Sequence, residues 1–106
     1  MWFAATILFR SEIDGLANLR PLCEERVVLF QAVSENEAQR HATLYAQREE
    51  HAYKNRANET VTWVFVAIEG LEVLDLPSPS GWPVASKYVR RTLRTLRRLE
   101  AARSGR

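Results

Sequence analysis

The sequence has little of what a disulfide-bonded or membrane-spanning protein needs. It contains one cysteine, Cys23, so no intramolecular disulfide can form, and we expect a reducing, cytoplasmic location. Its longest apolar run is about eight residues, far below the roughly 20 of a transmembrane helix. No basic residue precedes Arg10, which does not fit a secretory signal. We therefore expect no transmembrane segment.

Residue types that build common catalytic and metal sites are also scarce. The two histidines, His41 and His51, do not stand at metal-ligand spacing, and neither CxxC nor HExxH occurs. The chain has four glycines, and they form no glycine-rich phosphate loop. Cys23 precedes two carboxylates, which disfavour a reactive thiolate. We predict that the protein is not an enzyme and that it has no cofactor and no metal site.

What remains is the composition of one globular domain. A chain of 106 residues with 46% hydrophobic and 26% charged residues can build one core. Residues 1–86 carry seven Lys/Arg against twelve Asp/Glu, a net charge of −5, whereas residues 87–106 carry eight against one, a net charge of +7. This charge asymmetry bears on which partners the protein could bind rather than on its fold.

Apolar periodicity predicts the elements of an α+β fold. Strands are expected over 2–10, 22–33, 60–68 and 71–76, with Gly70 either breaking the last two apart or forming a bulge in one long strand. Ser34 and Glu37 form a capping box that predicts a helix over 35–51. Residues 1–76 should therefore form an antiparallel sheet of about four strands in the order β-β-α-β-β, with one packed helix.

The chain changes character after residue 76. Residues 77–83 hold three of the four prolines and predict a stiff linker. Residues 84–106 predict a C-terminal basic amphipathic helix with a frayed tail. Its cationic side could bind nucleic-acid phosphates, its apolar side could enter an anionic membrane, or it could pack on the domain or a second chain, which we favour. The cationic residues are Arg90, Arg91, Arg94, Arg97 and Arg98.

The best remaining candidate for a binding site is the corner after the first helix. Polar side chains are dense there, and either they lock the corner by hydrogen bonds, which we favour, or they recognise a ligand or partner. An acid–base pair is not expected, because adjacent residues on a helix splay apart by about 100°. The candidates are Glu50, His51, Tyr53, Lys54 and Asn55.

The strands expected over 2–10 and 60–68 are apolar on both faces. One helix covers one face of a sheet, so the C-terminal helix or a second copy of the chain must cover the other. Burying one large apolar side chain is worth about 1.5–3 kcal/mol, and a few of them would drive association. We therefore expect a homodimer.

Four segments resemble a known family. They are WFAATILF, FRSEIDG, PLCEERVVLFQAVSENEAQRHA and REEHAYKNRANETVTWVFVAIEGLEVL, and together they span about residues 2–76. In these segments the chain resembles the uncharacterised bacterial family known as domain of unknown function 4288. The resemblance implies a bacterial, cytoplasmic α+β domain and no particular activity. The arginine-rich end departs from the family pattern.

Two hypotheses for function follow. The first is a non-enzymatic protein-interaction or regulatory module. The alternative is a nucleic-acid-associated protein that binds phosphates through the C-terminal arginines. The partners expected are a second copy of the chain, another protein, or nucleic acid.

Overall fold

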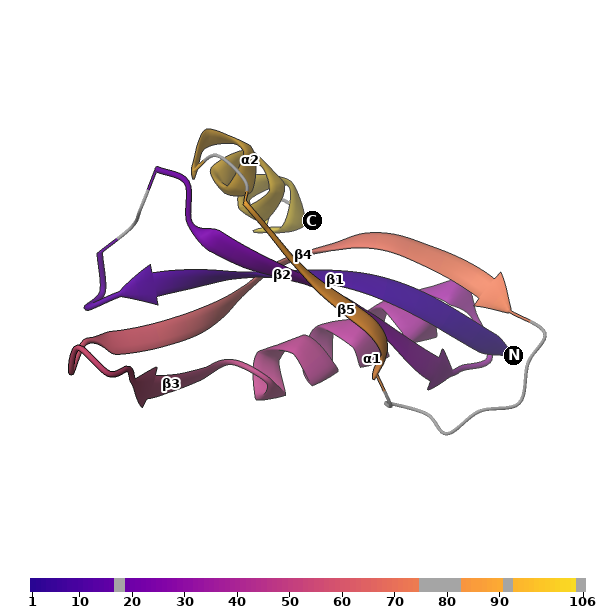
Figure 1. Ribbon diagram of the computed structural model, residues 1–106. Helices are drawn as coiled ribbons and strands as arrows, with labels where there is room; N and C mark the ends of the chain where they lie inside the picture. The colour runs from indigo at the N-terminus through magenta and orange to yellow at the C-terminus, as the bar shows by residue number, and fades with distance from the viewer. Residues whose placement is uncertain (17–18, 75–82, 91–92, 105–106) are drawn as a thin grey trace.

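The computed structural model describes residues 1–16, 19–74, 83–90 and 93–104. Its elements pack as a curled antiparallel sheet between two helices (Figure 1). In chain order they are β1 (Trp2–Ile13), β2 (Leu22–Gln31), α1 (Glu35–Arg48), β3 (His51–Lys54), β4 (Thr60–Leu74), β5 (Pro83–Arg90) and α2 (Leu93–Ser104). The predicted α+β class with an antiparallel sheet and a packed helix is confirmed.

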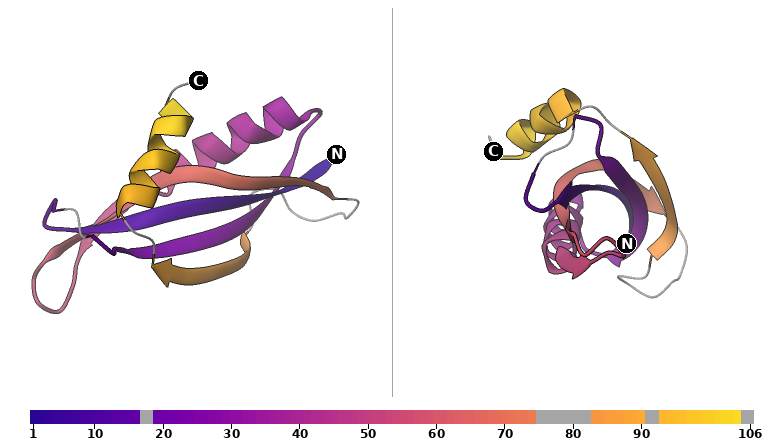
Figure 2. Two further views of the ribbon diagram at one scale, coloured as in Figure 1. Left: turned by 90° about the horizontal axis from the view of Figure 1, so that it is seen from above. Right: turned by 60° about the vertical axis from the view of Figure 1, so that its left-hand side comes forward.

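The sheet has the order β3-β4-β1-β2-β5, with β1 at its centre. β4 is one long strand, and Gly70 pairs with Thr6 inside it. The register between β1 and β4 shifts twice, which leaves Glu69 and Val66 as extra residues on β4. Such bulges bend a strand and increase its twist. The sheet accordingly curls around α1, as the end-on view in Figure 2 shows.

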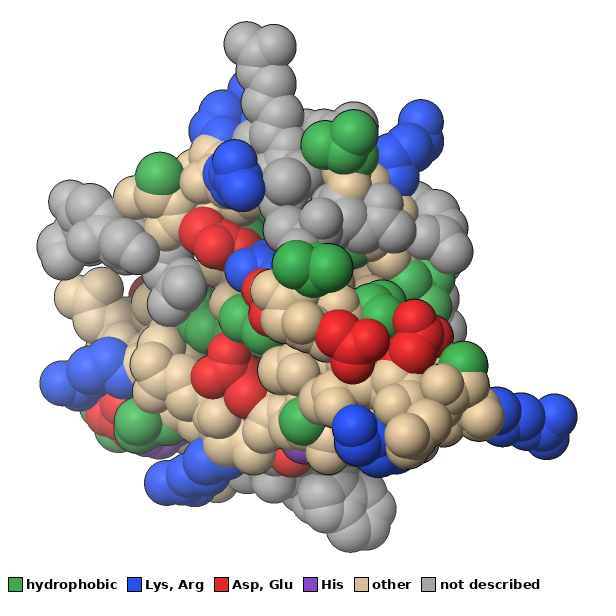
Figure 3. Space-filling view, turned by 90° about the vertical axis from the view of Figure 1, so that its left-hand side faces the viewer, with side chains coloured by type: hydrophobic (Ala, Val, Ile, Leu, Met, Phe, Trp, Pro, Cys, Tyr) green, Lys and Arg blue, Asp and Glu red, His purple; other side chains and the backbone are tan. Residues whose placement is uncertain are grey.

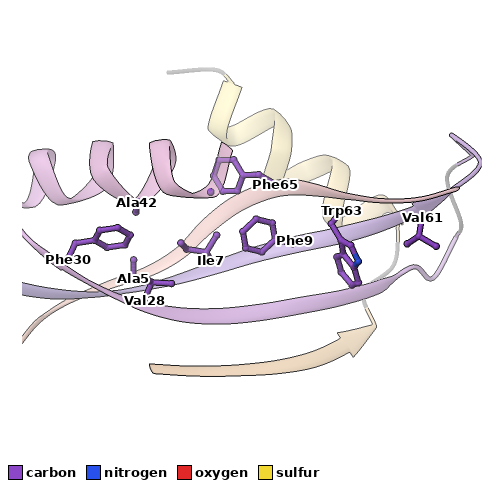
Figure 4. Close-up of a cluster of buried hydrophobic side chains, with 10 residues drawn as sticks. Ala5, Ile7, Phe9, Val28, Phe30, Ala42, Val61, Trp63 and Phe65 are labelled. Carbon is purple, nitrogen blue, oxygen red and sulfur yellow. The ribbon is translucent and has the colours of Figure 1, made fainter. Parts of the chain in front are cut away.

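α1 packs against the concave face of the sheet. Its inner stripe is Ala38, Ala42 and Ala46, all fully buried, because small side chains let a helix lie close to the strands. Ser34 caps its first turn, where the hydroxyl oxygen accepts a hydrogen bond from the Glu37 N–H at 3.2 Å. Figure 4 shows the main cluster beneath it. That cluster comprises Ala5, Ile7, Phe9, Val28, Phe30, Ala42, Ala46, Val61, Trp63 and Phe65.

α2 lies on the opposite face (Figure 1). Leu96 is 0% exposed and joins Leu8, Cys23, Val66 and Ala67 in a second cluster. Adjacent residues of a strand point to opposite faces, so Leu8 faces α2 while its neighbours Ile7 and Phe9 face α1. At this patch the expected second cover is supplied by the chain's own C-terminal segment.

The sheet has five strands rather than the predicted four or so, and at two places the chain forms a different element from the one the sequence predicted. The first helix ends at Arg48 rather than at 51, and His51 begins β3, which pairs with the start of β4. Residues 84–90 are not helical, because they belong to β5, which pairs with β2. The β-branched and aromatic residues Val84, Tyr88 and Val89 suit a strand as well as a helical stripe. The pairing partner offered by β2 decides between the two. Of the linker expected over 77–83, residues 77–82 lie outside the described residues, and Pro83 begins β5.

The end of the molecule that carries the β1–β2 and β3–β4 connections is tied together by a turn. Asp14 and Gly15 have φ values of 52° and 74°. The Asp14 N–H donates to the Thr60 carbonyl at 2.8 Å, and the Asp14 Oδ1 accepts from the Thr60 N–H at 2.8 Å. The connection between β1 and β2 is thereby fixed to the start of β4.

Candidate functional site

Glu50, the first residue of the predicted corner, binds the edge of the sheet. Its Oε2 accepts a hydrogen bond from the Phe65 N–H at 2.9 Å. Phe65 lies just beyond the stretch of β4 that pairs with β3, so its amide would otherwise face the sheet edge. The carboxylate therefore satisfies a backbone donor.

His51 and Tyr53 stack on the same face of β3. Their ring centroids are 5.9 Å apart with planes inclined by 22°. The His51 Nδ1 lies 2.8 Å from the Glu49 carbonyl oxygen. Since a carbonyl only accepts, Nδ1 carries a proton and donates. Tyr53 remains 47% exposed, and Lys54 is exposed two residues from the tip of the hairpin. Within the predicted corner, Tyr53 is an exposed large apolar side chain.

Asn55 locks the β3–β4 turn. Its Oδ1 accepts from the N–H groups of Ala57 at 3.0 Å and Glu59 at 2.9 Å, and its Nδ2 donates to the Glu59 carboxylate at 3.0 Å. Asn58 adopts a φ of 61° in the same turn, a conformation that asparagine tolerates. These bonds give Asn55 the structural role that the sequence favoured.

A charged cluster between β2 and the end of α1 was not predicted. The Arg26 guanidinium makes two parallel bonds to Glu24, at 3.0 and 2.9 Å, and its Nη1 donates to the Tyr45 hydroxyl at 3.1 Å and to Glu49 at 2.7 Å. Its carbon also lies 4.9 Å from the centroid of the Phe9 ring. We call these five residues the Arg26 cluster. A signal was present, because Glu24 and Arg26 stand two apart on one strand and so share a face.

Charge in the Arg26 cluster is fixed near neutral pH. Burial lowers the pKa of Arg26, but the hydrogen bonds that Arg26 donates to Glu24 and Tyr45 raise it by more, and the net pKa lies above the ordinary value. Burial raises the pKa of Tyr45, partly opposed by Arg26. The guanidinium thus stays charged and the phenol neutral, which suits a structural ion pair better than proton transfer.

The raised pKa of Tyr45 predicts a loss of stability in alkali. The folded-state value exceeds the unfolded value of about 10, so the stabilisation is complete below that pH and is lost as pH rises through the folded-state pKa. In urea unfolding between about pH 8 and 11, wild type should lose more unfolding free energy than Tyr45→Phe. Parallel curves for the two proteins would contradict this.

A second charged group joins β1 to α2. Arg10 donates through Nη1 to Glu12 at 2.6 Å and through Nε to Glu100 at 2.7 Å. Burial lowers the pKa of Arg10, but the hydrogen bonds that Arg10 donates to Glu100 and Glu12 raise it overall. This ion pair fixes which side of α2 faces the sheet.

The predicted cationic side is divided between two elements. Arg90 belongs to β5 rather than to a helix, Arg91 lies outside the described residues, and Arg94 is the second residue of α2. Arg97 and Arg98 are exposed on α2. The expectation that all five arginines share one helical side is therefore wrong. Because Leu96 is buried against the sheet, it is not free to enter a membrane.

Exposed leucines mark the β1–β2 connection. Leu16 is 72% exposed and Leu19 is 77% exposed, and Leu22 at the start of β2 is also exposed. Figure 3 shows this end of the molecule, where carboxylates gather near the centre among apolar side chains and most Lys and Arg side chains lie toward the periphery. We call Leu16, Leu19 and Leu22 the loop leucines.

The remaining features of the described residues are weaker candidates for a functional site. Among them, no group of three His, Cys, Asp or Glu side chains is placed to hold a metal ion. None of the helices in the described part of the chain is long and apolar enough to cross a bilayer. Cys23 is buried, and its thiol lies 3.6 Å from the Pro21 carbonyl oxygen. A shallow hollow lies along the outer side of α1; its lining is Gln39, Arg40, Thr43 and Leu44.

Comparison with known proteins gave one match. The model of the family described as Domain of unknown function (DUF4288) matches residues 2–80. No curated protein matches the chain. No solved structure matches it either. The matched range covers the sheet from β1 through β4 together with α1, and it ends before β5 and α2.

Proposed function

The chain belongs to the family described as Domain of unknown function (DUF4288), and from this premise we propose that it is a non-enzymatic protein-interaction module. The observation that carries the proposal is the exposure of the loop leucines on a connection that hydrogen bonds anchor at Asp14. Exposed large apolar side chains are a feature of surfaces that contact other proteins.

The polar residues considered as site candidates support the same proposal, because they already make structural contacts within the chain. Glu50 binds a strand amide, Asn55 closes a turn, and the Arg26 cluster joins β2 to α1. These groups hold the fold in place and carry no nucleophile activated by a neighbouring base. The module would therefore act by contact rather than by chemistry.

The surroundings of the loop leucines indicate the chemistry of a partner. The acidic residues Glu12 and Asp14 and the basic residue Arg20 lie on or beside the connection, and Arg10 forms an ion pair with Glu12 at 2.6 Å. Exposed leucines with charges of both signs nearby fit a partner that offers apolar side chains and complementary charges. A second copy of this chain is one such partner, since it carries the same leucines and charges. We propose a homodimer on this ground, and a cytoplasmic location from the free Cys23.

Two matched double variants test the proposal. Leu16→Ser with Leu19→Ser changes the loop leucines, whereas Val33→Ser with Leu44→Ser removes comparably exposed side chains elsewhere. Sedimentation velocity should show wild type and the second variant associating as the concentration rises, and the first remaining monomeric. Affinity capture would be run in parallel. A protein that binds wild type and the Val33/Leu44 variant but not the Leu16/Leu19 variant would support a partner other than a second copy of the chain. Equal behaviour of both variants in both assays contradicts the proposal.

A second candidate function rests on α2. Its apolar side faces the sheet, which leaves Arg97 and Arg98 exposed to meet phosphates. Binding of DNA or RNA should then weaken as salt rises from about 50 to 200 mM, with a negative log–log slope. Replacing Arg90, Arg91, Arg94, Arg97 and Arg98 with Gln should abolish that binding and leave the fold intact. A slope near zero rejects this candidate.

A further inference from the structure

Among the described side chains, fewer attach α2 to the sheet than attach α1. α2 packs on β4, and its fully buried described side chain is Leu96, with Leu99 partly packed beside it. The Arg10–Glu100 ion pair, at 2.7 Å, adds a polar contact. α1, in contrast, buries three alanines and joins the Arg26 cluster through Tyr45 and Glu49.

α2 also has weak intrinsic helical stability. It spans 12 residues, fewer than an isolated helix needs in water, and its first turn contains no acidic residue. Arg94 stands three and four residues before Arg97 and Arg98. Like charges at these spacings destabilise a helix. The helical form of α2 therefore depends on its contact with the sheet.

The rest of the sheet does not depend on α2 in the same way. β1 pairs with β2 on one side and with β4 on the other, and α1 fills the concave face. Release of α2 breaks none of these pairings. It would uncover Leu8, Cys23, Val66 and Ala67, which form one apolar patch.

From these contacts we propose that α2 is a displaceable cover. It opens while β1, β2, β4 and α1 stay folded, and it closes on the patch again through Leu96 and the Arg10–Glu100 pair. The patch is thus reserved for this segment of the chain and becomes accessible only in the open form. The device does not rest on the proposed function, because it involves neither the loop leucines nor the exposed arginines.

Cys23 reports the opening, because it is the chain's only cysteine and lies in the covered patch. The rate of its reaction with a neutral aromatic disulfide would be measured in native buffer and in low urea. Opening of the cover exposes little surface, so the rate should depend weakly on urea and exceed the rate allowed by global unfolding. Global unfolding would be measured on the same samples from the full denaturation curve.

Three variants complete the test. Glu100→Gln should raise the labelling rate about 3-fold, and Leu96→Ala by about 30-fold or more. Glu72→Gln changes charge equally at an exposed position of β4 and should leave the rate unchanged. Glu100→Gln is mild enough to remain folded if Leu96→Ala does not. If wild type and Glu100→Gln label only at the rate of global unfolding, with its full urea dependence, α2 is a fixed part of the fold and the proposal is overturned.

Discussion

Replacing Arg26 by alanine should lower the free energy of unfolding by about 2–4 kcal/mol. The side chain is 15% exposed and its main partner Glu24 is 11% exposed, so its removal leaves a largely buried carboxylate without its guanidinium. Glu49 is more exposed, and its lost contact costs less. Urea denaturation at neutral pH measures the change.

Arg26→Lys is the matched control for this prediction. Lysine keeps the charge but cannot make the two parallel bonds to Glu24 or stack its planar group on the Phe9 ring. Its stability should fall between those of wild type and Arg26→Ala. If alanine and wild type unfold at the same urea concentration, the cluster contributes nothing and our description of it is wrong.

Replacing Phe9 by alanine is expected to cost about 3–5 kcal/mol. The ring is buried at the centre of the concave core, 6.3 Å from the Phe65 ring, and the Arg26 guanidinium lies over it. The substitution removes a large buried apolar side chain. It also removes the aromatic ring over which the Arg26 guanidinium lies. Thermal and urea unfolding of the same variant measure the loss.

A double-mutant cycle separates those two effects. If Phe9 and Arg26 are coupled, the double variant Phe9→Ala with Arg26→Ala should lose less stability than the two single losses combined. Val33→Ala, at a highly exposed position, should change stability by less than about 0.5 kcal/mol. If the two losses of unfolding free energy simply add, the stabilisation by the Arg26 guanidinium does not depend on the Phe9 ring.

Local patterns in the sequence were sufficient for much of the fold. The capping box at Ser34 placed the start of α1. Apolar residues on both faces of the first strand indicated that two covers were needed, and clusters now lie on both faces. These predictions succeeded because each depends on neighbours within about one turn or one strand.

Features that depend on distant partners could not be predicted in the same way. Residues 84–90 carry a pattern compatible with helix or strand, and the pairing with β2 decides for the strand. Within the Arg26 cluster, Arg26 and Glu49 are 23 positions apart in the chain. The partner of Glu50 is the amide of Phe65, 15 positions away, which no local pattern reveals.

The loop leucines illustrate a different limit. In the sequence, Leu16 and Leu19 look like any other apolar residues of a connecting segment. Exposure distinguishes them, and exposure depends on where the Asp14 turn directs the chain. Their proposed role in binding is consequently a product of the structure rather than of the sequence.

The account depends most on the sheet being covered on both faces by helices of the same chain. NMR on an equimolar mixture of ¹³C-labelled and unlabelled chains tests this directly. We predict cross-relaxation between the methyl groups of Leu96 and those of Leu8 and Val66 within the labelled chain. Cross-relaxation only between labelled and unlabelled chains, or none at Leu96, would contradict the account.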